Sequence, residues 1–168
     1  MAKTSYAIAL GSNRRHGRHG SPAGVLRAAV EALERDFDVL ALSTIRSTPA
    51  LGPAGRGFAN AVLILSTDLE PDELLQELKS LERAFGRRPG RRWGPRVLDL
   101  DIILWSGGPW KEGGLIIPHP EMRQRRFVLD PLCEIAPDWH DPISGTSVRQ
   151  LRARLAAPRP VDRAAAPS

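Results

Sequence analysis

The sequence predicts a single domain of the α+β class, in which the elements follow the order β-α-β-β-α-β. The 168 residues are enough for one domain with a real core, and the apolar share of 42% is ordinary for a soluble protein. Several apolar runs are bounded by Gly, Pro, Asn or Ser, which is typical of strands. Two intervening segments instead carry apolar residues at helical spacing.

The first half of the chain opens with a strand and a helix. A buried strand is predicted over 5–13 and ends in a Gly-Ser-Asn turn. Ser21 and Pro22 predict a helix start, because Ser caps helices and Pro is favoured at the first helical position. The helix continues to about Arg35 and turns these residues inward: Val25, Leu26, Ala29, Val30 and Leu33.

Two more strands and a second helix follow. The strands are predicted over 37–48 and 58–67, with a Pro/Gly loop over 49–57 between them. The acidic stretch after Thr67 predicts the second helix, because carboxylates favour the positive end of the helix dipole. That helix ends near Gly86 and places four leucines inward: Leu74, Leu75, Leu78 and Leu81.

The last part of the chain contains an arginine-rich loop, a strand over 97–105 and a short strand over 115–118. The segment 121–155 is predicted to be mostly helical and irregular. Residues 157–168 are low in bulky apolar side chains, so we expect a disordered tail there. The elements together match the split βαβ pattern of a ferredoxin-like α+β sandwich with an antiparallel sheet. The predicted domain covers residues 1–156 and includes helices and long substrate loops.

Several features indicate a cytoplasmic protein. The N-terminal apolar run is too short to span a bilayer, and no cleavage-site pattern follows it. Cys133 is the only cysteine, so an internal disulfide is excluded, which agrees with a reducing compartment. Cys133 itself is interpreted as a small buried residue rather than a catalytic thiol, since nothing near it in sequence would activate it.

The positive charge of the chain is concentrated in two short segments. The net charge is +5, which favours polyanionic partners such as phosphates, nucleotides or nucleic acid. The arginines cluster over 86–96 and 123–126. Clusters this short favour a compact phosphate site over a long nucleic-acid groove.

Asp99 and Asp101 are the clearest candidates for chemistry. Side chains alternate along a strand, so both carboxylates lie on one face, about 7 Å apart, while Leu98, Leu100 and Ile102 lie on the other. Two carboxylates without His or Cys favour Mg²⁺, which usually shares such ligands with substrate phosphates. Two such aspartates alone are more often a solvent-facing polar stripe.

The arginine-rich loop before this strand favours a magnesium site over a solvent-facing polar stripe. Arginine side chains bind phosphate oxygens in a bidentate manner, and a loop rich in them beside a magnesium site suits polyphosphate transfer. Trp93 in the same loop either covers the core or closes over a flat heterocycle. The arginines are Arg87, Arg88, Arg91, Arg92 and Arg96.

The order of several sequence motifs resembles the 6-hydroxymethyl-7,8-dihydropterin pyrophosphokinases of folate synthesis. The likeness is collinear over roughly residues 5–140, which makes it far more specific than any single motif. The motifs are ALGSN at 9–13, STPALGP at 47–53, FANAV at 58–62, LERAFGR at 81–87, RWGPRVLDLDI at 92–102, PHPEM at 118–122 and RFVLDPLCEIAPD at 126–138.

The resemblance implies a magnesium-dependent enzyme that uses ATP. Asp99 and Asp101 would hold Mg²⁺, expected as two ions, together with the ATP phosphates. Arg87 and Arg96 would contact phosphates and stabilise the transition state. The hydroxymethyl oxygen of the pterin would attack the β-phosphorus and release AMP. The further ATP-binding positions would be Glu82, Ile102, His119 and Arg125.

The same resemblance implies a pterin pocket. The bicyclic ring would lie between Phe127 and either Phe58 or Trp93. Asn60 would hydrogen-bond the amide edge of the ring, because a desolvated donor- and acceptor-rich ring needs polar partners. Backbone and apolar contacts would come from three residues near the preceding loop: Thr48, Pro49 and Leu51.

Some positions depart from the family pattern. Pro89 stands where the family carries a second arginine, and Lys79 stands where some members carry glutamine. The stretch 111–114 lacks a basic residue found in some members. Two alternatives therefore stay open, a nucleic-acid-binding module and a degenerate relative without turnover. The pyrophosphokinase interpretation implies a monomer that binds ATP and pterin, without nucleic acid or membrane partners.

Overall fold

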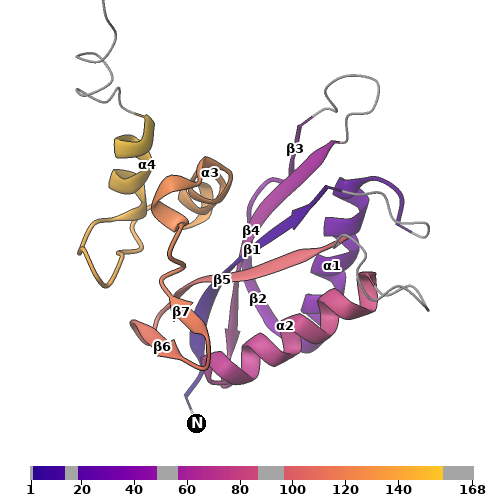
Figure 1. Cartoon of the computed structure of the whole chain (residues 1–168), viewed down its shortest axis with the longest axis horizontal. Coiled ribbons are helices and arrows are strands. Elements are labelled where there is room, and N and C mark those ends of the chain that lie inside the picture. Colours follow the sequence, from indigo (N-terminus) through magenta and orange to yellow (C-terminus); the bar gives the residue numbers. More distant parts are fainter. Residues whose placement is uncertain (1, 14–18, 49–56, 87–96, 157–168) are drawn as a thin grey trace, which may run out of the picture.

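The centre of the structure is a twisted antiparallel sheet with helices on both faces (Figure 1). This computed structural model describes residues 2–13, 19–48, 57–86 and 97–156. The strands are β1 (Thr4–Ser12), β2 (Asp38–Leu42), β3 (Arg46–Thr48), β4 (Phe58–Thr67), β5 (Asp99–Trp105), β6 (Trp110–Glu112) and β7 (Leu115–Ile117). The helices are α1 (Pro22–Asp36), α2 (Pro71–Gly86), a 3₁₀ turn η1 (Met122–Gln124), α3 (Arg126–Ile135) and α4 (Val148–Ala156).

The sheet has the strand order β2-β4-β1-β5, and β3 pairs with the end of β4 beside β2. Every pairing is antiparallel. The helices α1 and α2 each connect strands that are not neighbours in the sheet, as the predicted βαββαβ order requires. The predicted ferredoxin-like α+β fold is therefore confirmed.

The face of the sheet under α1 and α2 is a continuous apolar core. Alternate residues of β1 point into it, namely Tyr6, Ile8 and Leu10. Ser21 caps α1 as predicted, because its Oγ accepts the N–H of Gly24 at 3.2 Å. The residues predicted to face inward from α1 are all buried: Val25, Leu26, Ala29, Val30 and Leu33.

The opposite face is covered by α3 and α4, which hold a second apolar cluster against Ala7, Val62 and Ile103. The side chains that α3 contributes are Val128, Leu129 and Leu132. These contacts leave room on the sheet beside the first turn of α3, where the candidate site lies.

The structure differs from the prediction in three elements and in the burial of one side chain. The strand predicted over 37–48 is interrupted at Ser43, whose Oγ accepts the N–H of Val62 at 2.9 Å in place of a regular ladder. The last strand of the sheet begins at Asp99, two residues later than predicted. The strand β6 was missed, and it pairs with β7 in a short hairpin. Cys133 is half-buried against the second cluster rather than fully buried.

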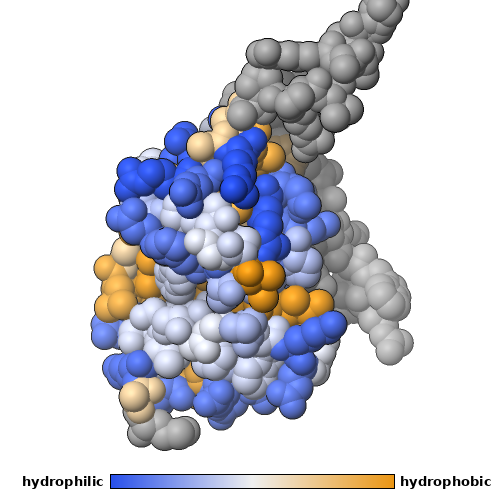
Figure 2. Space-filling model, turned by 90° about the vertical axis from the view of Figure 1, so that its left-hand side faces the viewer, coloured by the Kyte–Doolittle hydropathy of each residue, from blue (hydrophilic) through white to orange (hydrophobic). Residues whose placement is uncertain are grey.

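Hydrophilic side chains cover most of the surface on the side of α4 and the β6–β7 hairpin (Figure 2). Apolar residues on this side gather in a band across its middle. The outward positions of α4 are largely basic, with Arg149, Arg152 and Arg154 exposed. Within the described ranges, no helix has the length and apolar content needed to cross a membrane.

Candidate active site

A cavity of about 630 Å³ opens on the α3 side of the sheet. Its floor comes from the adjacent ends of β1, β4 and β5, and its wall comes from the first turn of α3. The residues that line it are Ala9, Leu10, Gly11, Ser12, Asn13, Thr48, Phe58, Asn60, Asp99, Asp101, Arg125, Phe127 and Val128. Segments that are far apart in sequence therefore meet at one place.

Two small residues of β1 form the middle of the floor. Gly11 lies between Asn60 on β4 and Asp99 on β5 in the strand register, and Ala9 lies beside Asp101. A Cβ added to Gly11 would lie 3.3 Å from the Oδ1 of Asn60. A larger residue here would fill the space between the amide and the carboxylates, so small side chains keep the floor open.

Asp99 and Asp101 lie on the same face of β5, and both line the cavity. Leu98, Leu100 and Ile102 instead pack into the core under α1 and α2. The alternation predicted for this strand is therefore confirmed. Over the described ranges, no group of three His, Cys, Asp or Glu side chains gathers to enclose a metal. A pair of carboxylates beside an open cavity fits Mg²⁺ that completes its shell with phosphate oxygens and water.

Two half-exposed aromatic rings line the same cavity. Phe58 is 50% exposed and Phe127 is 51% exposed, although both are large apolar side chains. One comes from β4 and the other from α3, so they approach the cavity from different elements. The guanidinium of Arg125 lies 5.5 Å from the centre of the Phe127 ring and also contacts Glu121. Exposed rings beside a cavity are suited to stack on a flat ligand.

Asn60 and Thr48 supply neutral polar groups to the cavity. Asn60 is opposite Arg46 in the β3–β4 pairing, and Thr48 is opposite Phe58. An amide offers both a donor and an acceptor, which suits recognition of a heterocyclic edge. The β3–β4 pairing thus places a hydroxyl, an amide and an aromatic ring along one wall.

A second cavity of about 250 Å³ adjoins the first, and Asp101 lines both. Its walls are mostly apolar, with Leu75 from α2, Ile102 from β5 and Ile116 from β7. Lys79 and His119 add polar groups. One carboxylate therefore stands between a cavity with aromatic walls and a cavity with aliphatic walls.

His119 is held in a defined orientation at the rim of the second cavity. Its backbone N–H donates to the carbonyl of Ile103 at 3.0 Å, and its Nδ1 accepts the N–H of Glu121 at 3.1 Å. With Nδ1 acting as the acceptor, a neutral ring carries its proton on Nε2 and can donate from that atom.

Glu82 lines neither cavity, but it contacts Leu100 and Lys79, which line the second. It is buried, and its Oε2 accepts the N–H of Leu100 at 2.7 Å. Its Oε1 lies 3.4 Å from the Nζ of Lys79. Glu82 therefore holds the backbone of β5 at the residue between the two aspartates, and it restrains Lys79 at the cavity wall.

Comparison with known proteins agrees with this geometry. Residues 7–137 match the family model for 7,8-dihydro-6-hydroxymethylpterin-pyrophosphokinase (HPPK). The chain belongs to this family.

Curated HPPK relatives extend over most of the chain. A 2-amino-4-hydroxy-6-hydroxymethyldihydropteridine pyrophosphokinase from Synechocystis sp. is 44% identical over 71% of this chain and 62% of its own length. The protein of the same name from Methylorubrum extorquens is 40% identical over 88% of this chain and 91% of its own length. A third, from Pseudomonas aeruginosa, is 40% identical over 80% of this chain and 82% of its own length.

Solved structures support the HPPK fold. The wild-type Plasmodium falciparum HPPK-DHPS crystal structure superposes with a TM-score of 0.69 at 12% identity. The match covers 90% of this chain and 41% of that chain. At this level of identity, the likeness supports the shared architecture and leaves the site to be argued from the residues themselves.

Some of the predicted HPPK site residues lie outside the described ranges. These are Pro49, Leu51, Arg87, Trp93 and Arg96, together with the departure at Pro89. Of the others, the first cavity brings together Thr48, Phe58, Asn60, Asp99, Asp101, Arg125 and Phe127. Ile102 and His119 line the second cavity.

Sequence reasoning did not assign several residues that line these cavities to the site, among them Ala9, Gly11, Leu75 and Ile116. Ala9 and Gly11 form the floor of the first, and Leu75 and Ile116 form walls of the second. The alternation of small residues in Ala9-Leu10-Gly11 was a usable signal, because both small side chains fall on one face of a strand. Leu75 and Ile116 look like ordinary core residues in the sequence and carry no such signal.

Proposed function

We propose that this HPPK family member transfers pyrophosphate from ATP to 6-hydroxymethyl-7,8-dihydropterin, giving AMP and the pterin diphosphate used in folate synthesis. The observation that carries the proposal is that Asp101 lines two adjoining cavities of different character. One suits a flat, hydrogen-bonding ring, and the other suits a nucleotide. A carboxylate between them is where the reacting groups of two substrates would meet.

The first cavity is the proposed pterin site. Phe58 and Phe127 would stack on the ring, and Asn60 would hydrogen-bond its amide edge. Thr48 lies next to Phe58 across the β3–β4 pair and would contact the ring from the same wall. From the family resemblance, we expect Pro49, Leu51 and Trp93 to complete this site.

The second cavity is the proposed nucleotide site. The aliphatic walls from Leu75, Ile102 and Ile116 suit a purine base. His119 would donate to phosphate through Nε2, and Arg125 would reach phosphate from the first cavity. Glu82 supports this site through Lys79 and Leu100 rather than by lining it. Arg87 and Arg96 are expected to bind the same phosphates.

We propose that Asp99 and Asp101 hold Mg²⁺, expected as two ions, together with ATP phosphates. Bound there, Mg²⁺ would neutralise charge on the phosphates and orient them. The protein would contribute mainly by placement, since the pterin hydroxyl must lie in line with the bond from the β-phosphorus to the leaving AMP oxygen. Asp99 is the nearest candidate to accept the hydroxyl proton.

The ion pairs of the described arginines argue against the nucleic-acid-binding alternative. Several described arginines lie within ion-pair distance of carboxylates, which lowers their availability to a phosphate backbone. They are Arg46, Arg123, Arg126, Arg149 and Arg152. We further propose a cytoplasmic monomer without nucleic-acid or membrane partners.

The deciding experiment measures AMP release from ATP and Mg²⁺, with and without 6-hydroxymethyl-7,8-dihydropterin. Wild type should form AMP only with pterin, and Asp101→Ala should abolish it. Asp72→Ala is a matched control, because Asp72 is an exposed carboxylate in the first turn of α2 and lines neither cavity. Chelation with EDTA should stop the reaction, and added Mg²⁺ should restore it.

A folded protein that binds an ATP analogue but releases no pterin-dependent AMP would contradict the proposal. That outcome would favour the degenerate relative or a different acceptor. Salt-sensitive binding of RNA or DNA without any response to ATP would favour the nucleic-acid-binding module.

A further inference from the structure

β3 carries Thr48 into the wall of the proposed pterin site. The chain that leads to it leaves the β2–β4 pairing at Ser43 and pairs with β4 again in β3. Ser43 keeps contact with β4 by donating its N–H to the carbonyl of Val62 at 2.9 Å. Its Oγ donates to the carbonyl of Thr44 at 3.1 Å. β3 is only three residues long and exposed throughout, and within the described ranges it pairs with β4 alone. A strand this short needs support from elsewhere to hold Thr48 in place.

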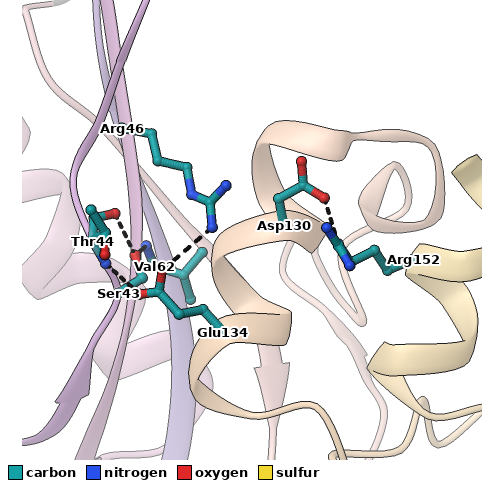
Figure 3. Close-up of polar contacts among 7 residues, drawn as sticks. All are labelled: Ser43, Thr44, Arg46, Val62, Asp130, Glu134 and Arg152. Atoms are coloured by element: carbon teal, nitrogen blue, oxygen red, sulfur yellow. Dashed lines mark hydrogen bonds and ion pairs between the residues drawn. The ribbon is translucent and has the colours of Figure 1, made fainter.

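Glu134, near the end of α3, supplies such a support (Figure 3). Its Oε2 accepts the backbone N–H of Thr44 at 2.5 Å, and its Oε1 lies 3.3 Å from the Nη2 of Arg46. The N–H of Thr44 holds the pKa of Glu134 below its ordinary value, so the carboxylate is charged at neutral pH. One side chain thus binds the connection between β2 and β3 at Thr44 and the first residue of β3 at Arg46.

The same helix carries the opposite wall of the cavity. Phe127 and Val128 line it from the first turn of α3. Glu134 follows Phe127 by two helical turns, about 10 Å along the axis. It therefore joins the helix that presents Phe127 to the strand that presents Thr48, without lining the cavity itself.

We propose that Glu134 is a positioning residue that sets the spacing between the α3 wall and the β3–β4 wall, and thereby the affinity for the flat substrate. The inference rests on the proposed pterin pyrophosphokinase function. Stacking and edge hydrogen bonds both depend on sub-ångström placement, so a loosened wall should weaken pterin binding before it affects the nucleotide. The nucleotide cavity involves α2, β5 and β7, whereas the hydrogen bonds of Glu134 go to Thr44 and to Arg46 at the start of β3.

Asp130 provides a matched control on the same helix (Figure 3). It lies one turn before Glu134 and accepts from the Nε of Arg152 on α4 at 2.8 Å. Both residues are thus carboxylates of α3 in charge-assisted hydrogen bonds to another element. Only Glu134 connects the helix to the strand that carries Thr48.

The test compares Glu134→Ala, Glu134→Gln and Asp130→Ala by pterin-dependent AMP release and by thermal unfolding. Glu134→Ala should raise the KM for pterin about tenfold, which corresponds to about 1.4 kcal/mol, and change the KM for Mg-ATP less than about twofold. Glu134→Gln retains an acceptor for the N–H of Thr44 and should recover most of the affinity. Asp130→Ala should lower the melting temperature while leaving both KM values near wild type.

Amide hydrogen exchange over 44–48 adds a readout that does not depend on turnover. Exchange should accelerate there in Glu134→Ala and stay at the wild-type rate in Asp130→Ala. Unchanged exchange in Glu134→Ala, or an equal rise in pterin KM for both alanine variants, would overturn the positioning role. A wild type without pterin-dependent AMP would instead overturn the proposed function, while the exchange rates would still decide whether Glu134 orders this strand.

Discussion

The two faces of the central sheet are made from the same strands but carry different kinds of side chain. Under α1 and α2, alternate residues such as Ile8, Leu63 and Leu100 form a continuous apolar core. On the α3 side, the intervening positions begin with a smaller apolar cluster and end in the candidate active site. The first cavity opens on the α3 side, whereas the second is bordered by Leu75, Leu100 and Ile102 of the core under α1 and α2.

This division shows how one strand can serve stability and chemistry at once. Along β5, Leu100 and Ile102 pack into the core and also border the second cavity, while Asp99 and Asp101 lie on the other side of the strand and line the first. The buried face fixes the backbone, so the carboxylates can be held close together despite their repulsion. Substitutions of the carboxylates and of core residues that line neither cavity should therefore separate loss of activity from loss of stability.

The largest expected effect comes from the carboxylates of β5. Asp99→Asn and Asp101→Asn, made separately, should each lower kcat/KM on the order of 10²–10³-fold, as found when a group that stabilises a transition state is removed. Their free energies of unfolding should stay within about 0.5 kcal/mol of wild type, because each variant also relieves carboxylate repulsion. Steady-state AMP release and urea unfolding measure the two quantities.

On the face of the sheet under α1 and α2, a loss of stability without a loss of pterin affinity is expected. Leu63 is fully buried in the core under α1 and α2, so Leu63→Ala should destabilise the protein by about 2–5 kcal/mol. At temperatures where the variant stays folded, its KM for pterin should match wild type. Urea unfolding and AMP-release kinetics on the same preparation would test both. A large change in pterin KM with little loss of stability would contradict the separation of the faces.

Much of this division was predictable from sequence, because it follows from the period of two along a strand. The alternation of Leu98, Asp99, Leu100 and Asp101 predicts both the buried face and the paired carboxylates. The inward residues of α1 follow from helical spacing in the same way, and the N-cap at Ser21 follows from a local rule.

The rest depends on contacts between distant segments, which leave no local pattern. The break at Ser43 is stabilised by Val62, which lies 19 residues away in sequence. The support from Glu134 to Thr44 spans 90 residues. Ser43 and Glu134 are of residue types that also occur at ordinary strand and helix positions, so only their tertiary contacts reveal their roles.

Polar contacts contribute to the α3 side where the apolar cluster is smaller. The carboxylate of Asp141 is fully buried and accepts from the Nε of Arg123 at 2.7 Å and from the N–H of Ile143 at 2.9 Å. Burial raises the pKa of Asp141, but the hydrogen bonds from Ile143, Ser144 and Arg123 outweigh it, and the net shift is downward.

Asp141→Asn should therefore cost about 1–3 kcal/mol of stability at neutral pH, since it weakens several hydrogen bonds to a buried group. A lowered pKa in the folded state means that the carboxylate stabilises the fold above its unfolded pKa of about 3.9 and loses that effect as the pH falls through the folded value. The difference between variant and wild type, measured by urea unfolding from pH 7 to pH 3, should shrink below about pH 4. A difference that stays constant over this range would contradict the assignment.

The smallest effect, and the sharpest test of the pterin wall, concerns an aromatic ring on the open face. Phe127→Ala should raise the KM for pterin about tenfold, since stacking is worth about 0.5–1.5 kcal/mol beyond the area buried. Because the ring is already 51% exposed, the melting temperature should change little. Leu40→Ala is the matched control, because Leu40 is 56% exposed on β2 and lies outside both cavities. If the two variants changed the pterin KM equally, the loss would reflect a general loosening of the sheet, and Phe127 would have no direct part in binding the ring.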